Sequence, residues 1–233
     1  RSFGGGELAL VTESSAEAVL PGATWLQTAE GTSHSGMEDD TAAALAGAFE
    51  AMPCNGISAL QTDGCELKVL RAHVPPVPRL LVIGAGPDAV PLVRLAAELG
   101  WRVTITDHRP AYLQAPGLDV ADARIEARAG TLAEALKPSE FHAAVVMTHH
   151  LDSDREHLRE LASEGPDYVG LLGPRARRER LLAELGPGGL ALSSRLHGPV
   201  GLDIGAQSPE TIALAIAAEI QAHFATASTP LHS

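Results

Sequence analysis

A glycine-rich turn between an apolar run and a helical run constrains the fold of this chain more than any other part of its sequence. Residues 80–89 read Leu-Leu-Val-Ile-Gly-Ala-Gly-Pro-Asp-Ala, which is a strand that leads into Gly-x-Gly-x-x-Ala and the start of a helix. In such a turn Gly84 permits the sharp bend, Gly86 lets a pyrophosphate approach the backbone, and Ala89 lets the helix pack closely on the strand. The free N–H groups at the start of the helix then face the phosphate. The pattern predicts a cradle for a nucleotide-like ligand.

An acidic residue follows at the position that this turn requires. Asp107 ends the next predicted strand, where a carboxylate accepts hydrogen bonds from ribose hydroxyls. Arg109, two residues further on, is a candidate for a phosphate contact, and the alternative is a solvated arginine of the turn. The strand, turn, helix and acid together predict a Rossmann half-fold.

The rest of the C-terminal two thirds of the chain alternates strands with helices. We expect strands at 79–83, 101–107, 143–148 and 168–172, and helices at 88–99, 131–136, 175–185 and from 209 to about 225. Ser153 and Glu156 form a capping box that predicts the start of one further helix, and Ser208 is the expected N-cap of the last one. Such alternation is typical of a parallel sheet with helices on both faces. Residues 78–233 are therefore expected to form a Rossmann-like α/β domain.

A proline-rich segment at 73–79 separates this domain from the first third of the chain. Proline fixes φ and lacks an N–H donor, so the segment is expected to be an extended linker. Before it we expect strands at 7–12, 24–28 and 66–70 and an amphipathic helix at 38–52. Residues 1–77 are therefore predicted to be a small α+β domain.

The charge and the cysteine content exclude several classes of function. The 17 basic and 29 acidic side chains give a formal net charge of −12, which does not suit a protein that neutralises a nucleic-acid backbone. Cys54 and Cys65 are too far apart for a Cys-x-x-Cys motif, so neither a zinc ribbon nor a disulfide framework is expected, and the compartment is expected to be the reduced cytoplasm. No membrane span or signal peptide is expected, because no apolar run of about 18 residues occurs.

A histidine pair follows the third strand of the predicted sheet. Ligands bind at the carboxyl ends of the strands in open α/β sheets, so His149 should face the same crevice as the glycine turn. Histidine is a common proton-transfer residue, and Asp154 is placed to orient His149, which makes the two residues candidates for proton transfer. A loop histidine beside a helix-capping acid is the alternative. No suitably spaced third ligand is apparent, so no metal site is expected.

An arginine-rich helix follows the next strand. Gly173 ends that strand, and Arg175 and Arg178 offer guanidinium groups that suit a phosphate or another planar anion. The alternative is a solvated helix in which Glu179 and Glu184 pair with these arginines.

A second glycine-rich loop precedes the last helix. Gly201 and Gly205 lie in it, before the capped start of that helix, which makes it another candidate for anion binding. The geometry of the loop alone is the alternative explanation for these glycines.

Five blocks of residues in this order resemble the XdhC/CoxI family, the accessory factors of xanthine dehydrogenase and related molybdenum hydroxylases. Two of them, 78–86 and 103–109, are generic Rossmann features, and a third is Thr148-His149 followed by Asp154. The other two are distinctive: Tyr-Val-Gly-Leu-Leu-Gly-Pro-Arg at 168–175 and Gly-Pro-Val-Gly-Leu-Asp-Ile-Gly-Ala-Gln-Ser-Pro-Glu at 198–210. The resemblance covers nearly all of the second domain.

The resemblance implies a cofactor-handling accessory factor more than a catalyst. Such a protein binds the molybdenum cofactor (molybdopterin, a phosphorylated pyranopterin), guards it during sulfuration and helps to insert it into a xanthine dehydrogenase- or carbon monoxide dehydrogenase-type hydroxylase. A separate cysteine desulfurase would supply the sulfur, and a homodimer is implied. Residues 1–77 resemble the smaller N-terminal domain of the family only weakly, since its Gly-Ser-x-Pro-Arg segment is absent and Met37 stands where a cysteine is common.

Two alternatives remain open from the sequence. One is an NAD(P)-dependent oxidoreductase in which His149 transfers the proton, and the other is a non-catalytic module that senses a dinucleotide. Neither Tyr112 nor Tyr168 has a lysine four residues on, which excludes the Tyr-x-x-x-Lys arrangement of short-chain dehydrogenases.

Overall fold

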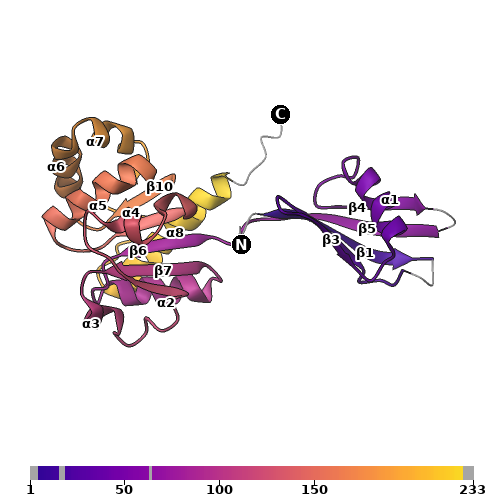
Figure 1. Ribbon diagram of the computed structural model, residues 1–233, viewed down its shortest axis with the longest axis horizontal. Coiled ribbons are helices and arrows are strands. Elements are labelled where there is room, and N and C mark those ends of the chain that lie inside the picture. The colour runs from indigo at the N-terminus through magenta and orange to yellow at the C-terminus, as the bar shows by residue number, and fades with distance from the viewer. Residues whose placement is uncertain (1–4, 16–18, 63–64, 228–233) are drawn as a thin grey trace. The chain divides into compact units, whose positions relative to one another are not determined.

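The computed structural model describes residues 5–15, 19–62 and 65–227. The chain divides into two compact units, Arg1–Val77 and Pro78–Ser233. Figure 1 shows the ribbon of both units. Each unit has its own hydrophobic core.

The first unit is an antiparallel sheet of five strands with one helix packed against it. Its elements are β1 (Gly6–Ser14), β2 (Thr24–Thr28), β3 (Gly31–Ser35), α1 (Asp39–Phe49), β4 (Gly56–Thr62) and β5 (Cys65–Val74). The strands lie in the order β3-β2-β1-β5-β4. Leu45 and Phe49 of α1 are buried against Trp25, Leu67 and other apolar residues of the sheet, and these contacts form the core. Neither β3 nor β4 was predicted. All five residues of β3 are exposed, so it lacks an apolar alternation, whereas β4 alternates between exposed and half-buried residues.

The second unit is a parallel sheet of six strands in the order β11-β10-β9-β6-β7-β8. Its strands are β6 (Arg79–Ile83), β7 (Arg102–Asp107), β8 (Ala123–Glu126), β9 (Ala143–Val146), β10 (Tyr168–Leu171) and β11 (Leu196–His197). Its helices are α2 (Ala89–Glu98), α3 (Pro110–Leu113), α4 (Leu132–Ala135), η1 (Pro138–Glu140), α5 (Leu151–Glu164), α6 (Arg175–Leu185), α7 (Pro187–Leu192) and α8 (Pro209–Ala227).

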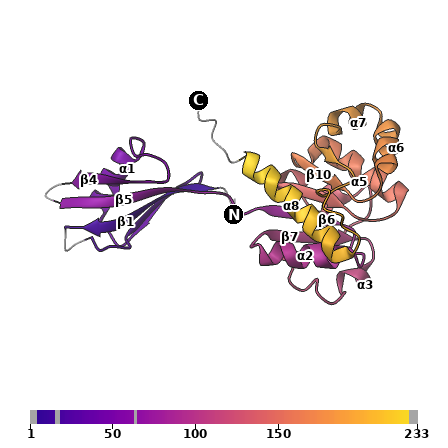
Figure 2. The same cartoon turned by 180° about the vertical axis from the view of Figure 1, so that it is seen from behind.

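The helices cover both faces of this sheet, which confirms the predicted fold class. Leu80 and Val82 of β6 belong to a core shared with α2 and α8, whereas Leu81 and Ile83 belong to a core shared with α4, α5, α6 and α7. Figure 2 shows α8 and α2 in front of the sheet. This alternation along a strand buried on both faces is the pattern expected of a parallel sheet.

The start of α5 differs from the prediction. The helix begins at Leu151, with His150 at the N-cap position and no side-chain cap, so Ser153 lies within the first turn instead of capping it. By contrast, Ser208 caps α8 as predicted, because its Oγ accepts a hydrogen bond from the N–H of Thr211 at 3.3 Å. The two short strands β8 and β11, of four and two residues, were not predicted.

Candidate functional site

The glycine turn lies between the end of β6 and the start of α2. Its two glycines, Gly84 and Gly86, differ in backbone conformation and in the space around them. Gly84 has φ +105°, and a Cβ atom at this position would lie 2.8–2.9 Å from backbone atoms of Met147 and Thr148. Gly86 has no left-handed φ, and a Cβ atom there would meet nothing within 4 Å. Gly84 is therefore required by the fold itself, whereas no internal contact among the described residues accounts for Gly86.

Asp107 holds this turn from the end of β7. Its carboxylate accepts hydrogen bonds from the N–H of Ala85 at 2.8 Å and from the N–H, Nε and Nη2 of Arg109 at 2.9 Å each. Burial raises the pKa of the Asp107 carboxyl, but the hydrogen bonds from Arg109 and Ala85 outweigh that effect and hold the pKa below its usual value. The expectation that Asp107 offers free oxygen atoms to a ribose is therefore wrong for this structure: the residue is 5% exposed and its carboxylate positions the turn.

Arg109 is fixed in place by two contacts. Besides its ion pair with Asp107, its guanidinium carbon lies 3.6 Å from the centre of the Tyr112 ring, which is a cation–π contact. Its side chain is nevertheless 39% exposed, so part of the guanidinium still faces solvent.

His149 lies beside the glycine turn but is paired differently from the prediction. Its Nε2 is 3.0 Å from Oδ2 of Asp88, the residue just before α2. Its backbone has φ +58°, a left-handed conformation that is uncommon for a residue other than glycine. The predicted partner Asp154 does not contact it. The sequence contained Asp88 within the glycine turn, but its spacing gave no sign of a histidine partner from the loop after β9.

Asp154 has a buried role on α5. The carboxylate is 1% exposed, accepts a hydrogen bond from Oγ1 of Thr148, and accepts two from Arg177, one of them from Nε at 2.9 Å. The prediction that Asp154 orients His149 is therefore wrong. The helix directs Asp154 towards α6, while the left-handed turn at His149 leads to a different partner. Asp154 anchors the loop that follows β9.

The arginines of α6 do not assemble an anion site. Arg175 is 81% exposed and pairs with Glu179 of its own helix at 2.7 Å. Arg178 donates to the carbonyl oxygens of Leu196 and Ser193 at 3.0 Å each. The Arg175–Glu179 pair corresponds to the solvated-helix alternative, whereas Arg178 binds backbone carbonyl oxygens, a contact that neither interpretation included. Gly173 lies two residues after the end of β10 and has φ +137°, a backbone conformation that favours glycine.

The second glycine loop is held by a residue that the sequence analysis missed. Glu219 of α8 accepts a hydrogen bond from the N–H of Gly201 and another from the hydroxyl of Tyr168 at 2.9 Å, and it pairs with His197. An acid on the apolar face of α8, one turn beyond Ala215, was the available signal. Gly201 has φ +104°, and a Cβ atom there would lie 3.0 Å from Ala215; Gly205 has φ +72° and open space around it. The backbone conformation of the loop accounts for both glycines.

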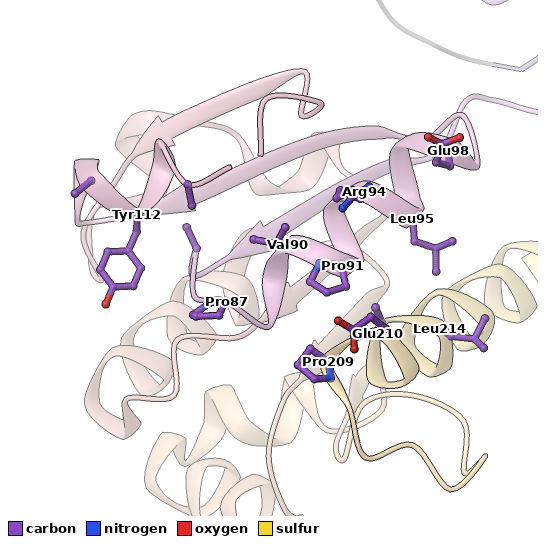
Figure 3. Close-up of a pocket in the computed structure, with 14 residues that line it drawn as sticks. Pro87, Val90, Pro91, Arg94, Leu95, Glu98, Tyr112, Pro209, Glu210 and Leu214 are labelled. Atoms are coloured by element: carbon purple, nitrogen blue, oxygen red, sulfur yellow. The ribbon is translucent and has the colours of Figure 1, made fainter. Parts of the chain in front are cut away.

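A cleft with a volume of about 1070 Å³ extends from the glycine turn along α2 to the start of α8. Its wall is formed by Ala85 and Pro87 of the turn, by Val90, Pro91, Arg94, Leu95 and Glu98 of α2, by Ala111, Tyr112 and Ala115, and by Pro209, Glu210, Ala213 and Leu214 of α8 (Figure 3). Most of these side chains are apolar, with a few charged groups among them. This composition is typical of a small-molecule site, and sequence reasoning did not anticipate that α8 contributes to it.

Two further classes of site are not found in the part of the chain that the structure describes. It contains no group of three or more histidine, cysteine, aspartate or glutamate side chains arranged to hold a metal ion. Among the same residues, no helix has the length and apolar character needed to span a bilayer.

Comparison with known proteins decides the family. Residues 80–220 match the XdhC Rossmann domain, which is more than half of the chain. The chain belongs to the XdhC family. A curated relative from Bacillus subtilis (strain 168), described as a probable subunit of xanthine dehydrogenase, is 42% identical over 148 residues, which are 64% of this chain and 43% of the relative.

Two other proteins are similar to this XdhC chain, one in sequence and one in fold. The uncharacterized protein YqeB of Escherichia coli (strain K12) is 31% identical over 173 residues, which are 72% of this chain and 32% of that protein. A crystal structure of a protein described as a xanthine dehydrogenase from Bacillus halodurans superposes with a TM-score of 0.61 at 20% identity, covering 99% of this chain and 94% of that one, and supports the fold. The chain spans less than half the length of the two curated relatives.

The left-handed backbone of His149 makes a prediction for this XdhC domain. Both His149→Ala and His149→Gly lose the contact with Asp88, but only alanine must bear the left-handed conformation. Chemical denaturation should therefore find the alanine variant less stable than the glycine variant by about 1 kcal/mol. The control is Ala222→Gly, at an exposed position within α8. There the glycine variant should be less stable than the unsubstituted protein, which has alanine. Equal stability of the two His149 variants would contradict the observed turn.

Proposed function

We propose that this protein is an accessory factor that binds the molybdenum cofactor and assists its maturation and its insertion into a xanthine dehydrogenase- or carbon monoxide dehydrogenase-type hydroxylase. Membership of the XdhC family supports this proposal, as does the description of the Bacillus subtilis relative as part of a xanthine dehydrogenase. The cofactor is then cargo: it supplies the redox centre of the hydroxylase, and the accessory factor holds and protects it. A cysteine desulfurase that supplies sulfur and a second copy of the chain are the further partners that we propose.

Gly86 is the observation that carries the proposal. It sits at the mouth of the turn with no left-handed φ and with open space where a Cβ atom would be, so neither the backbone nor the packing of the described residues requires glycine. A ligand that approaches the backbone closely would require it. The apolar wall of the cleft suits a planar heterocycle, and the start of the ten-residue helix α2 suits a phosphate.

Two residues of the turn make its backbone a weaker phosphate site. Pro87 has no N–H to donate, and the carboxylate of Asp88 lies at the start of α2, where it pairs with His149. The backbone of the turn therefore offers fewer donors than a turn without proline, and a bound phosphate also needs side-chain cations. A phosphorylated heterocycle that uses the cleft for its ring fits these residues better than a ligand held by its pyrophosphate alone.

The test compares small molecules released from purified protein. Full-length protein made in a host that produces molybdopterin is denatured, and the released molecules are identified by mass spectrometry. We expect molybdopterin from the unsubstituted protein and at least a tenfold lower yield from Gly86→Val, whose melting temperature should be nearly unchanged because a Cβ atom at this position meets nothing within 4 Å. Gly47→Val, at an exposed position of α1 with similar open space, should retain the ligand.

The other outcomes of this measurement contradict the proposal. Release of a dinucleotide in place of the pterin would favour the oxidoreductase or sensor alternatives, with the Asp88–His149 pair as the proton-transfer group of the former. Release of nothing, together with no binding of added molybdopterin at micromolar concentration, would overturn cofactor binding. Equal yields from Gly86→Val and the unsubstituted protein would place the ligand elsewhere.

A further inference from the structure

Asp107 lies at the end of β7, where an acid binds the ribose hydroxyls in dinucleotide-binding proteins. In this structure its carboxylate is not free to do so. A ribose diol donates two hydrogen bonds to such a carboxylate. The Asp107 carboxylate already accepts four hydrogen bonds, one from Ala85 and three from Arg109, and Nδ1 of His108 lies a further 3.3 Å from it. A carboxylate has about four lone-pair sites, so the four donors from Ala85 and Arg109 occupy all of them. A diol would have to displace Arg109.

The group that remains available at this end is the guanidinium of Arg109. Its Nε and Nη2 are held by Asp107, and the described residues provide no hydrogen-bond acceptor for Nη1. The Tyr112 ring on which it stacks also lines the cleft, so the cation lies next to a residue of the cleft wall. Since both contacts fix the side chain before any ligand arrives, little rotamer freedom is lost when it binds an anion.

The exposed edge of the Arg109 guanidinium suits an anion better than a neutral diol. The Asp107 carboxylate is buried and neutralised by the guanidinium, and the neighbouring His108 side chain is 56% exposed. A phosphomonoester brings between one and two negative charges and three acceptor oxygens, which suit an exposed guanidinium edge.

We propose that Arg109 forms a phosphomonoester subsite at the β7 end of the cleft, and that this end of the site rejects an unphosphorylated ribose. The proposal rests on the proposed function only in that the cleft takes a phosphorylated ligand. Two molecules could supply the phosphate: molybdopterin through its terminal phosphate, or a nucleotide through a ribose 2′-phosphate. The shared chemistry is a phosphomonoester held by the free edge of Arg109.

A pair of probes that differ by one phosphate tests the subsite. NADP⁺ and NAD⁺ are titrated separately into the full-length protein by isothermal calorimetry, and the ratio of the two dissociation constants is the readout. We expect NADP⁺ to bind about 10- to 100-fold more tightly than NAD⁺, the range expected for a charge-assisted contact. Equal binding, tighter binding of NAD⁺, or no binding of either at millimolar concentration would overturn the proposal.

Variants assign the preference to Arg109. In Arg109→Met the ratio should fall to about one, and in Arg109→Lys, which keeps a charge without the planar fork, it should be intermediate. The control is Arg159→Met on α5, which removes a half-exposed arginine that pairs with Glu156 of its own helix and should leave the ratio unchanged. Loss of Arg109 leaves the buried Asp107 carboxylate with fewer donors and lowers stability, but the ratio is measured on one preparation and does not depend on the folded fraction.

Competition with molybdopterin separates this proposal from the proposed function. If molybdopterin binds and NADP⁺ displaces it at least tenfold better than NAD⁺, the phosphate of the cofactor uses the Arg109 subsite. A preference for NADP⁺ without any binding of molybdopterin would contradict the proposed function and leave the subsite standing. Binding of molybdopterin with no preference between the two nucleotides would contradict the subsite and leave the proposed function standing.

Discussion

Gly84→Ala is expected to destabilise the Rossmann unit by roughly 2–5 kcal/mol, the sum of a left-handed residue that alanine tolerates poorly and of overpacking against a backbone. Gly84 has φ +105°, and its missing Cβ would lie 2.8–2.9 Å from backbone atoms of Met147 and Thr148. A flexible side chain could move away from such a contact. The backbone of Met147 and Thr148 directly follows β9, and it cannot move without disturbing the end of that strand. The loss therefore exceeds that of an ordinary glycine substitution.

The measurement needs a probe that reports on the second unit alone. The chain has two tryptophans, one in each unit, so Trp25→Phe leaves Trp101, which is 5% exposed, as the fluorescent reporter. Denaturant unfolding in this background gives the free energy for the Rossmann unit. Gly100→Ala is the matched control, because Gly100 has φ +78° but open space around it, and it should lose only about 1–2 kcal/mol.

Comparison of the two glycines separates conformation from packing. If Gly84→Ala and Gly100→Ala are equally destabilised, the close approach of the glycine turn to the β9 loop is refuted. If Gly84→Ala loses more, the approach is a requirement of the fold. Together with the tolerance expected of Gly86→Val, this outcome would assign one glycine of the turn to folding and the other to the ligand.

The sequence predicted the parts of the structure whose signals are local. β6 and α6 have the predicted bounds, because an apolar run next to a glycine turn and a charged helical run each read clearly. β11 has only two residues and β3 is exposed along its whole length, so neither carries a periodic pattern. The same limit applies to the cleft, since the packing of α8 beside α2 is a long-range contact.

The candidate site was harder to predict than the fold, because its pairs join distant segments. Spacing along the chain places His149 and Asp154 near the same sheet edge, but it does not give the direction of either side chain. A single left-handed residue turns His149 towards Asp88, and the helix turns Asp154 towards Arg177. Asp107 was correctly placed at the end of β7, yet its partner two residues on uses the lone pairs that a ribose would need.

The pair formed by Asp154 and Arg177 gives the other large prediction. Asp154→Ala is expected to destabilise the Rossmann unit by about 3–5 kcal/mol, because it leaves the guanidinium of Arg177, whose side chain is only 19% exposed, without its partner. The hydroxyl of Thr148 loses its acceptor as well, so the loop that carries His149 loses its anchor. Denaturant unfolding followed by Trp101 measures the loss, and Asp152→Ala is the control.

The control separates a buried pair from an exposed one on the same helix. Asp152 is 69% exposed and pairs with Arg155, so its removal should change the free energy of unfolding by about 1 kcal/mol or less. The double variant Asp154→Ala/Arg177→Met should be more stable than Asp154→Ala alone, because it no longer holds an unpaired charge in the interior. Similar losses for Asp154→Ala and Asp152→Ala would show that the buried pair contributes little.

Affinity for molybdopterin distinguishes a structural role of Asp154 from a role in proton transfer. If Asp154 acts by holding the loop, Arg177→Met must weaken ligand binding as Asp154→Ala does, although Arg177 is not a proton-transfer group at neutral pH. If Asp154 instead reacts with the ligand, Arg177→Met would retain affinity while Asp154→Ala loses it. The contacts of Asp154 with Thr148 and Arg177 favour the first outcome, because they leave its buried carboxylate, 1% exposed, engaged within the protein.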